Sequence, residues 1–285
     1  MTTEQEKGAV LVTGTSSGIG RALALHLDRL GFRVFAAVRS ERDAEAWRSQ
    51  ATSRLSTVLL DVTDAGSVAR ARKDVGRALG DSGLWGLVNN AGMSFRAPLE
   101  AVSLERLRAL FDVNVFGALA VTQAFLPLLR RCRGRVVNVS SIASVLVTPF
   151  HGPYSASKVT LNALSTALRL ELAPLGVQVS IMIVGGVQTE IWNKVVRLTE
   201  EATGNLSPEL EAAYGARQRR ALDYFMSRGR SGMSPDAAAR AIGRALTDKR
   251  AKRTYLVGRD ARAYLLLSGL LSGGLRDRFI LRRLR

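Results

Sequence analysis

The sequence has few of the residues that form disulfide bonds and metal sites. Its 285 residues include one cysteine, Cys132, and two histidines, His26 and His151. One cysteine excludes an internal disulfide, and so small a set leaves no plausible His/Cys metal cluster. Arginines flank Cys132, but no histidine, asparagine or aspartate motif accompanies it, so we interpret the thiol as incidental. The chemistry must therefore use other groups.

Acidic residues are also scarce, and the deficit is uneven along the chain. The 41 basic and 24 acidic residues give a net charge of +17, and residues 201–285 hold 18 of the basic and 8 of the acidic ones. Such an excess of positive charge is typical of proteins that bind nucleic acid or an anionic membrane surface, and also of a solvated helical face. The basic residues are mostly scattered arginines without interleaved aromatic residues, and no nucleic-acid motif is present. We therefore expect no nucleic-acid partner.

The two ends of the chain lack the features of export or of a membrane span. The opening "MTTEQEKGAVLVTG" has acidic residues where a signal peptide is positive, so we expect a cytoplasmic protein. Residues 261–285 combine leucine clusters with arginines, but the apolar part is too short and too broken by glycine to cross a bilayer. This extension fits peripheral contact with an anionic membrane, a cover on the substrate pocket, or a contact within a homodimer or homotetramer. Contact with protein is the favoured interpretation.

Short apolar runs alternate with amphipathic segments along most of the chain. This alternation predicts an α/β fold with a parallel sheet covered on both faces. It lapses at about 187–235, where helical segments flank "TGNLSP". We interpret that insertion as a lid, with a plain surface excursion as the alternative, inside a single domain of residues 1–260. The expected strands are 9–13, 33–38, 57–62, 84–91, 135–141, 178–184 and 254–258.

A glycine-rich loop follows the first expected strand. In "TGTSSGIG" the glycines would allow a tight turn, close approach of the backbone to a phosphate, and tight packing of the helix that follows. The start of that helix offers free N–H groups to an anion. The loop therefore predicts a nucleotide site, with an ordinary glycine-rich turn as the alternative. Its residues are Gly14, Ser16, Ser17, Gly18, Ile19 and Gly20.

Tyr154 and Lys158 stand four residues apart in "HGPYSASK". On a helix this spacing places both on one face, about 5–6 Å apart at Cβ. Such a pair arises by chance in many helices, so it indicates a catalytic pair only together with other motifs.

Those motifs are present. "TGTSSGIG", "NNAG" at 89–92, Asn114 in "DVNVFG", "VNVSS" at 137–141 and "YSASK" resemble, in order and spacing, the short-chain dehydrogenase/reductase family. "LWGLVNNAG" and the basic, apolar C-terminus look most like the retinol and hydroxysteroid dehydrogenase branch. The resemblance implies a doubly wound Rossmann fold with seven parallel strands and a nicotinamide dinucleotide at their carboxyl edge.

The resemblance also implies the catalytic roles. Tyr154 would act as acid/base toward the alkoxide that hydride transfer leaves. A free tyrosine has a pKa of about 10, so Lys158 would lower that pKa and also hydrogen-bond the nicotinamide ribose. Ser141 would bind the substrate oxygen, and Asn114 would hold a water that connects the lysine to solvent.

The second expected strand indicates which dinucleotide is bound. NAD enzymes of this fold place an acid at the end of that strand, but here Val38 stands there and Arg39 follows, a residue suited to a 2′-phosphate. We therefore expect NADP(H) rather than NAD(H). Gly185 replaces the proline that the family usually has after the sixth strand, so we expect a more flexible loop there. By resemblance, further cofactor contacts are Asp61, Val62, Asn89, Ala91, Gly92, Val187 and Thr189, together with Tyr154 and Lys158.

The expected substrate walls are mostly apolar. No arginine or lysine stands in 142–153, which favours a small lipophilic alcohol or ketone, steroid- or retinoid-like, over a carboxylate or phosphate. His151 would reach a polar group of the substrate or, as the favoured alternative, cap its own turn. A ketoreductase of a polyketide or other secondary metabolite and a non-catalytic dinucleotide sensor remain alternatives. The substrate residues expected are Met93, Phe95, Ser141, Val147, His151, Tyr154 and Trp192.

Overall fold

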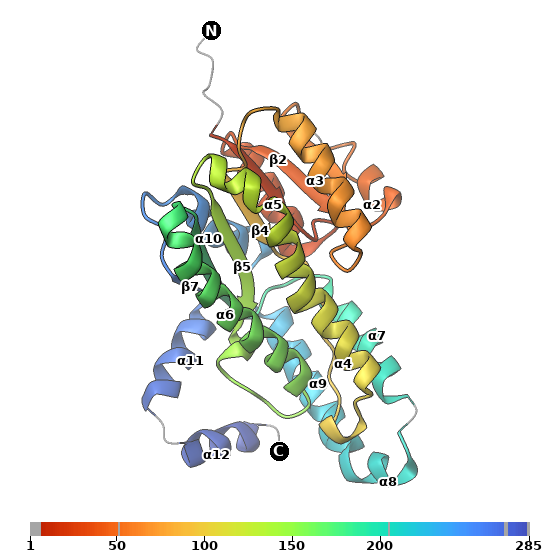
Figure 1. Ribbon diagram of the computed structural model, residues 1–285. Helices are drawn as coiled ribbons and strands as arrows, with labels where there is room; N and C mark the ends of the chain where they lie inside the picture. The colour runs from red at the N-terminus through yellow and green to blue at the C-terminus, as the bar shows by residue number, and fades with distance from the viewer. Residues whose placement is uncertain (1–6, 51, 205, 271–272, 284–285) are drawn as a thin grey trace.

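The computed structural model describes residues 7–50, 52–204, 206–270 and 273–283 (Figure 1). In this part of the chain seven parallel strands form one sheet, in the order β3-β2-β1-β4-β5-β6-β7. This confirms the predicted Rossmann fold. The strands are β1 (Ala9–Val12), β2 (Arg33–Val38), β3 (Leu55–Leu59), β4 (Gly86–Asn89), β5 (Arg135–Ser141), β6 (Gln178–Val184) and β7 (Thr254–Val257).

Helices cover both faces of the sheet because successive strand residues point to opposite sides. Val10 and Val12 of β1 join a buried cluster with α1 and α10, whereas Ala9 and Leu11 join one with α3 and α5. The apolar runs are therefore continuous rather than alternating with polar residues. The helices of these layers are α1 (Gly18–Arg29), α2 (Glu41–Glu45), α3 (Ala65–Leu79), α5 (Ala118–Arg131), α6 (Gly152–Leu172) and α10 (Pro235–Thr247).

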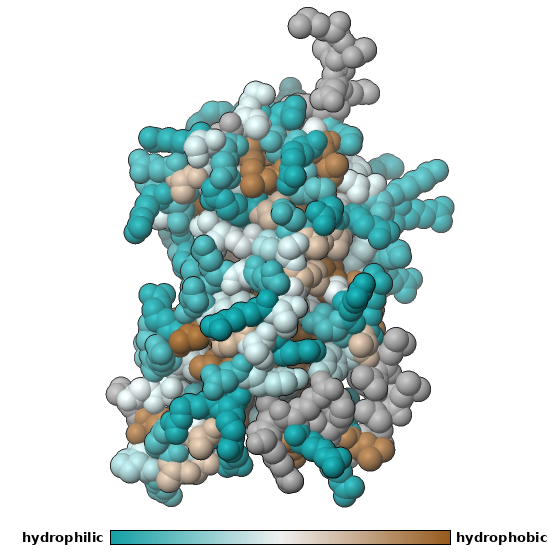
Figure 2. Space-filling model, turned by 180° about the vertical axis from the view of Figure 1, so that it is seen from behind, coloured by the Kyte–Doolittle hydropathy of each residue, from teal (hydrophilic) through white to brown (hydrophobic). Residues whose placement is uncertain are grey.

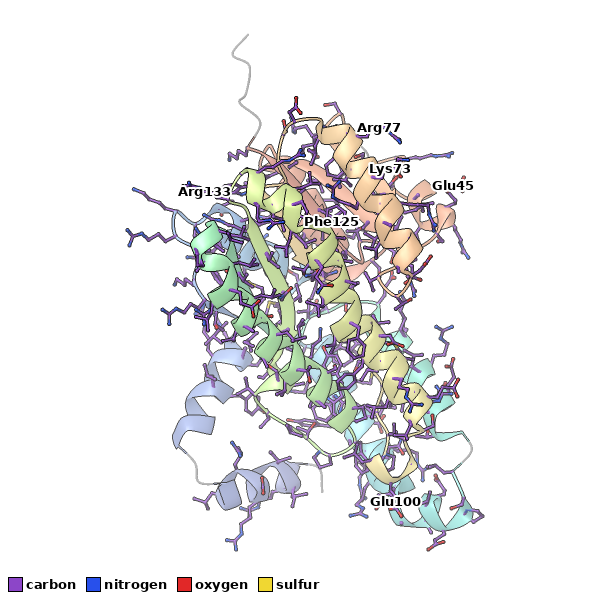
Figure 3. All side chains as sticks on the ribbon, in the orientation of Figure 1. Glu45, Lys73, Arg77, Glu100, Phe125 and Arg133 are labelled. Atoms are coloured by element: carbon purple, nitrogen blue, oxygen red, sulfur yellow. The ribbon has the colours of Figure 1, made fainter. Side chains whose placement is uncertain are left out.

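A long helical stretch precedes β5 and is interrupted by a π-helix. It runs through α4 (Leu104–Phe111), the π-helix at Asp112–Gly117 and α5. This stretch, Leu104–Arg131, is long and apolar enough to cross a membrane by length and composition alone. The buried core helix of a soluble protein meets the same criteria, so this is weak evidence for a membrane span. Here Phe125 of α5 packs into the sheet core (Figure 3).

The predicted insertion lies at the carboxyl edge of the sheet (Figure 1). Ser207 caps α8 by accepting a hydrogen bond from the Leu210 N–H. The Tyr214 hydroxyl donates to Glu100 at 2.7 Å, which ties the insertion to the loop after β4. The helical segments expected around "TGNLSP" are present: α7 (Ile191–Thr203), α8 (Pro208–Leu210), a π-helix at Glu211–Gly215 and α9 (Ala216–Arg230).

The last two helices, α11 (Arg259–Leu270) and α12 (Gly273–Arg283), stand outside the layers (Figure 1). Leu275 and Leu281 of α12 are more than half exposed, at 53% and 52%. On the face of the molecule that points away from the viewer in Figure 1, hydrophilic side chains dominate and the apolar surface is broken into small patches (Figure 2). Within the residues that the structure describes there are also three short 3-10 helices: Leu99–Ala101, Ile142–Ser144 and Ala173–Leu175.

Candidate active site

Tyr154 and Lys158 lie on one face of α6, where the chain passes the carboxyl ends of β4 and β5. The Lys158 Nζ is 5.7 Å from the centre of the Tyr154 ring. It donates a hydrogen bond of 2.9 Å to the Val139 carbonyl of β5. Lys158 is 4% exposed, so the ammonium is held at one place beside the phenol.

Ser141 ends β5 and joins this pair. Its hydroxyl accepts a hydrogen bond of 3.2 Å from the Ala143 N–H, which orients it at the strand end. The same side chain hydrogen-bonds with the Tyr154 phenol. The structure therefore brings Ser141, Tyr154 and Lys158 together, although β5 and α6 are separated by a loop.

Asn114 lies in the π-helix, and its side-chain amide makes three hydrogen bonds within the protein. Its Oδ1 accepts from the Met93 N–H at 2.9 Å, and its Nδ2 donates to the Met93 carbonyl at 2.9 Å and to the Ser157 hydroxyl at 3.0 Å. The amide thus ties α4 and α5 to the loop after β4 and to α6. The Asn114 Oδ1 keeps one acceptor position, and its expected role in holding a water stays a prediction.

Burial dominates the electrostatics of the pair. It raises the pKa of Tyr154 above its ordinary value, and hydrogen bonding with Ser141 and the charge of Arg96 offset this only in part. It lowers the pKa of Lys158 to about 8. We expected Lys158 to lower the pKa of Tyr154; that prediction is wrong for this structure, because desolvation of the phenol outweighs the cations, and the cation that acts on it is Arg96.

His151 covers the phenol. Its ring stacks on that of Tyr154, with centres 4.7 Å apart and planes 19° apart, and its Nε2 lies 3.0 Å from the Ser94 hydroxyl. Burial, helped by the charge of Arg96, holds the pKa of His151 well below its usual value, so the ring is neutral at pH 7. The predicted turn cap is wrong, since the imidazole makes no cap at the start of α6.

Arg96 is the residue that sequence reasoning missed. It lies in the loop after β4, is 2% exposed, and reaches the site from outside the 142–153 segment that we searched for charged residues. The available signal was an arginine four residues after the "NNAG" motif, in a loop rather than on a polar helix face.

The glycine loop fits a dinucleotide phosphate. Gly14 and Gly18 have φ of +68° and +59°, and a Cβ at Gly14 would lie 2.8 Å from the Ala91 Cα. No side chain caps α1, whose first N–H groups follow Ser17. Glycines at positive φ, absence of side chains and an uncapped helix start are what close approach of a phosphate requires.

The loop is held in place by a residue that we did not single out. The Asn90 side chain donates to the carbonyls of Thr13 and Gly14, at 2.9 and 3.1 Å. Asn89, which we expected to line the cofactor, instead donates to Thr122 and Asn138 inside the core. Asn89 therefore joins strands and helices, and Asn90 shapes the loop.

Arg39 and Asp61 lie close enough to interact at the ends of β2 and β3. Arg39 is exposed after buried Val38, and its charge helps to lower the pKa of Asp61, although hydrogen bonds from Thr63 contribute more and burial opposes both. Val62 packs against Gly117, where a Cβ would come within 2.7 Å of it. Arg39 is thus free to meet a group at the adenosine end of a dinucleotide.

The loop after β6 is bonded to α11 through Asp260. The Asp260 carboxylate of α11 accepts from the Gly186 N–H at 2.7 Å and fills the space beside Gly185, where any side chain would collide with it. Val187 is buried and bridges to Met233, and Thr189 lies against Gly18, 3.2 Å from the position of a Cβ there. Asp260 thus fills the space that a side chain at Gly185 would need, and the expectation of a more flexible loop stays a prediction.

The expected substrate walls are only partly assembled. Met93 is half-buried and packs on the cluster that contains Phe95, which is 2% exposed. Trp192 is half-buried, and its indole N–H donates to the Val187 carbonyl at 2.9 Å. Val147 is 57% exposed. Phe95 is therefore a core residue of this loop, whereas Met93 and Trp192 are only partly buried.

Comparison with known proteins decides the family. The family model described as short chain dehydrogenase matches residues 8–199, which is more than half of the chain. This chain belongs to the short-chain dehydrogenase family. It is therefore an oxidoreductase, and the family uses NAD(P)(H).

Relatives place this dehydrogenase more finely. Retinol dehydrogenase 16 of Homo sapiens is 44% identical over 221 residues, covering 76% of this chain and 69% of that protein. 17-beta-hydroxysteroid dehydrogenase type 6 of Homo sapiens is 38% identical over 279 residues, covering 96% and 87%. A short chain dehydrogenase from Burkholderia cenocepacia in complex with NADP superposes with a TM-score of 0.72 at 27% identity, covering 98% of each chain. The predicted branch is thus confirmed.

Proposed function

We propose that this dehydrogenase interconverts a hydroxyl and a carbonyl on a lipophilic, steroid- or retinoid-like substrate, with NADP(H) as its cofactor. The observation that carries the proposal is the Tyr154 phenol, which lies between Ser141 and Lys158 at the sheet edge that also holds the glycine loop. The names of the retinol and hydroxysteroid dehydrogenase relatives support the substrate class.

When bound, the dinucleotide supplies or accepts the hydride. The chain's own residues would position it: the N–H groups at the start of α1 would bind the diphosphate, Lys158 the ribose, and Arg39 the 2′-phosphate. Solved structures of this fold hold NADP in one case and NAD in another, so the preference for NADP(H) depends on Arg39.

The phenol completes the reaction by moving a proton. In the reducing direction the substrate oxygen gains negative charge, and the Ser141 hydroxyl would stabilise it by hydrogen bonding. Tyr154 then gives that oxygen its proton. Its raised pKa keeps the phenol protonated at neutral pH, which is the form an acid requires. Lys158, with a pKa lowered to about 8, releases a proton near neutrality and would restore the phenol.

The test is Tyr154→Phe, assayed with NADPH and NADH against steroid, retinoid and simple aromatic carbonyls. We expect turnover to fall by about 10²–10⁴-fold, while fluorescence titration shows cofactor binding within about threefold of wild type. The expected pattern has a simple cause: the substitution removes the proton donor and leaves the glycine loop untouched.

Tyr255→Phe is the matched control, because it removes one hydroxyl that bonds Asp248 and the Lys252 N–H far from the site. It should keep full turnover. Full turnover in Tyr154→Phe would overturn the proposal. Cofactor binding with no turnover of any carbonyl by wild type would favour the dinucleotide sensor, and activity confined to acyl-carrier thioesters would favour the ketoreductase.

A further inference from the structure

Arg96 is buried without a charged partner. In the described part of the chain its Nε and Nη1 have no hydrogen-bond partner, and no carboxylate pairs with its guanidinium. Its guanidinium carbon instead lies 3.6 Å from the centre of the Phe225 ring of α9. A charge removed from water in this way destabilises the folded state unless something compensates it.

The backbone around Arg96 is clamped, so the side chain is held where it is. The Arg96 N–H donates to the Thr199 hydroxyl of α7 at 3.0 Å, and its carbonyl accepts from Gln218 of α9 at 3.3 Å. The next N–H, of Ala97, donates to the Phe150 carbonyl at 2.9 Å. Three bonds from three segments fix the loop on both sides of the guanidinium.

The guanidinium belongs to the reactive end of the site. Its charge acts on both Tyr154 and His151, and Phe225, on which it stacks, lies 6.2 Å from the His151 ring. Burial lowers the pKa of Arg96 to about 9, so it still carries its charge at neutral pH. The group is therefore a cation whose charge acts on the phenol, connected to it through the rings of Phe225 and His151, and its Nε and Nη1 have no partner among the described residues.

The other deeply buried arginine shows the contrast. Arg135, at 5% exposure, donates from Nη1 to the Ala245 carbonyl at 2.9 Å and stacks on Trp85. That arginine has a structural partner at the amino end of the sheet. Arg135 leaves only its Nε without a partner, whereas Arg96 leaves both Nε and Nη1 without one among the described residues. These two Arg96 donors are closed off from solvent, so a ligand would reach them only if the side chains that cover them, Phe225 among them, moved.

We propose that Arg96 binds a carboxylate of the substrate, so that this dehydrogenase acts on lipophilic hydroxy or keto acids whose acidic group lies close to the reacting carbon. Two guanidinium N–H groups match the two oxygens of a carboxylate. The inference rests on the proposed function for the hydroxyl or carbonyl carbon that reacts. The bound anion is inferred from Arg96, independently of that proposal. This assignment also reverses our expectation from 142–153, because the cation comes from a different loop.

The probes are benzoylformate, 3-benzoylpropionate and 5-benzoylpentanoate, each with its methyl ester. Calorimetry with NADP⁺ bound to the enzyme measures binding alone, since no hydride is then available to the ketone. Turnover of the same compounds with NADPH is measured separately. For at least one spacing we expect the acid to bind wild type at least about tenfold more tightly than its ester, the effect of one charge-assisted pair.

In Arg96→Met the acid should bind no more tightly than its ester, so that the ratio of acid affinity to ester affinity (the acid-to-ester ratio) falls to near one. The ester itself should bind within about twofold of its affinity for wild type. Arg96→Lys, which keeps the charge but not the fork, should retain part of the ratio. Arg135→Met is the control: it should lower the melting temperature and leave the ratio unchanged. If Arg96→Met does not fold, Arg96→Gln serves the same comparison. The acid should raise the melting temperature of wild type and not that of Arg96→Met.

An acid-to-ester ratio that is the same in wild type and Arg96→Met, or esters that bind wild type better than acids, would overturn the inference. The two proposals fail separately. Acids that bind through Arg96 but are never reduced would contradict the proposed function alone. Ketones that are reduced in a manner dependent on Tyr154, with a ratio insensitive to Arg96, would contradict the inference alone.

Discussion

Arg39 is the residue from which we infer the proposed preference for NADP(H). Arg39→Asp would replace a cation near the 2′-phosphate with an acid that suits a free 2′-hydroxyl. We expect the dissociation constant for NADPH to rise by about 10–100-fold, because a hydrogen bond to a charged group is worth about 1.5–3 kcal/mol. Affinity for NADH should be unchanged or better, as measured by fluorescence titration. Arg77→Asp, outward on α3 (Figure 3), controls for net charge; equal losses in both variants would contradict the assignment.

Lys158 should make stability depend on pH. Its pKa in the folded chain is about 8, below its ordinary value of 10.5, so between these values the unfolded chain binds more protons. The free energy of unfolding should therefore rise with pH in this window. Between pH 7 and 9.5 the urea midpoint of wild type should rise relative to that of Lys158→Met. Lys73→Met, on the exposed face of α3 (Figure 3), should run parallel to wild type. If the urea midpoints of Lys158→Met and wild type change equally with pH, the proposed effect of burying Lys158 is refuted.

At the scale of elements, α11 holds the loop after β6 through Asp260. Gly185→Ala would drive a methyl group into that carboxylate, which two N–H groups anchor at 2.7 and 2.9 Å. We expect it to destabilise the protein by about 1–3 kcal/mol, and to do so much less in an Asp260→Ala background. Chemical denaturation of the double-mutant cycle measures the difference. Gly274→Ala, with open space around it, should be close to neutral; additive losses would contradict the contact.

The strands show which part of an element is readable from sequence. The expected 33–38, 135–141 and 178–184 coincide with β2, β5 and β6, because each apolar run ends where the ladder ends. The expected 57–62 differs from β3 at Leu55–Leu59, since Leu60 and Val62 remain buried in the core after pairing with β2 stops. Burial and strand pairing are separate properties, and hydrophobicity reports only burial.

For the whole molecule, we expect a homodimer or homotetramer in which α12 contacts another subunit. Leu275→Gln with Leu281→Gln should then lower the mass measured by light scattering toward the 30.8 kDa monomer. Burial of these two leucines at an interface is the physical reason, as they are exposed in a single chain. If the mass is unchanged and the double variant no longer sediments with vesicles of anionic lipid as wild type does, the basic extension contacts a membrane instead.

The sequence by itself determined the order of strands and helices, the glycine loop, and the Tyr154–Lys158 spacing. These follow from local rules: the period of the apolar residues, positive φ at glycine, and the rise of a helix. Tertiary structure alone decided that the charge of Arg96, 58 residues before Tyr154, acts on the phenol, that Asp260 fills the space beside Gly185, and that burial raises the pKa of the phenol. These effects depend on which residues, distant in the sequence, pack together away from water. No local sequence pattern determines that.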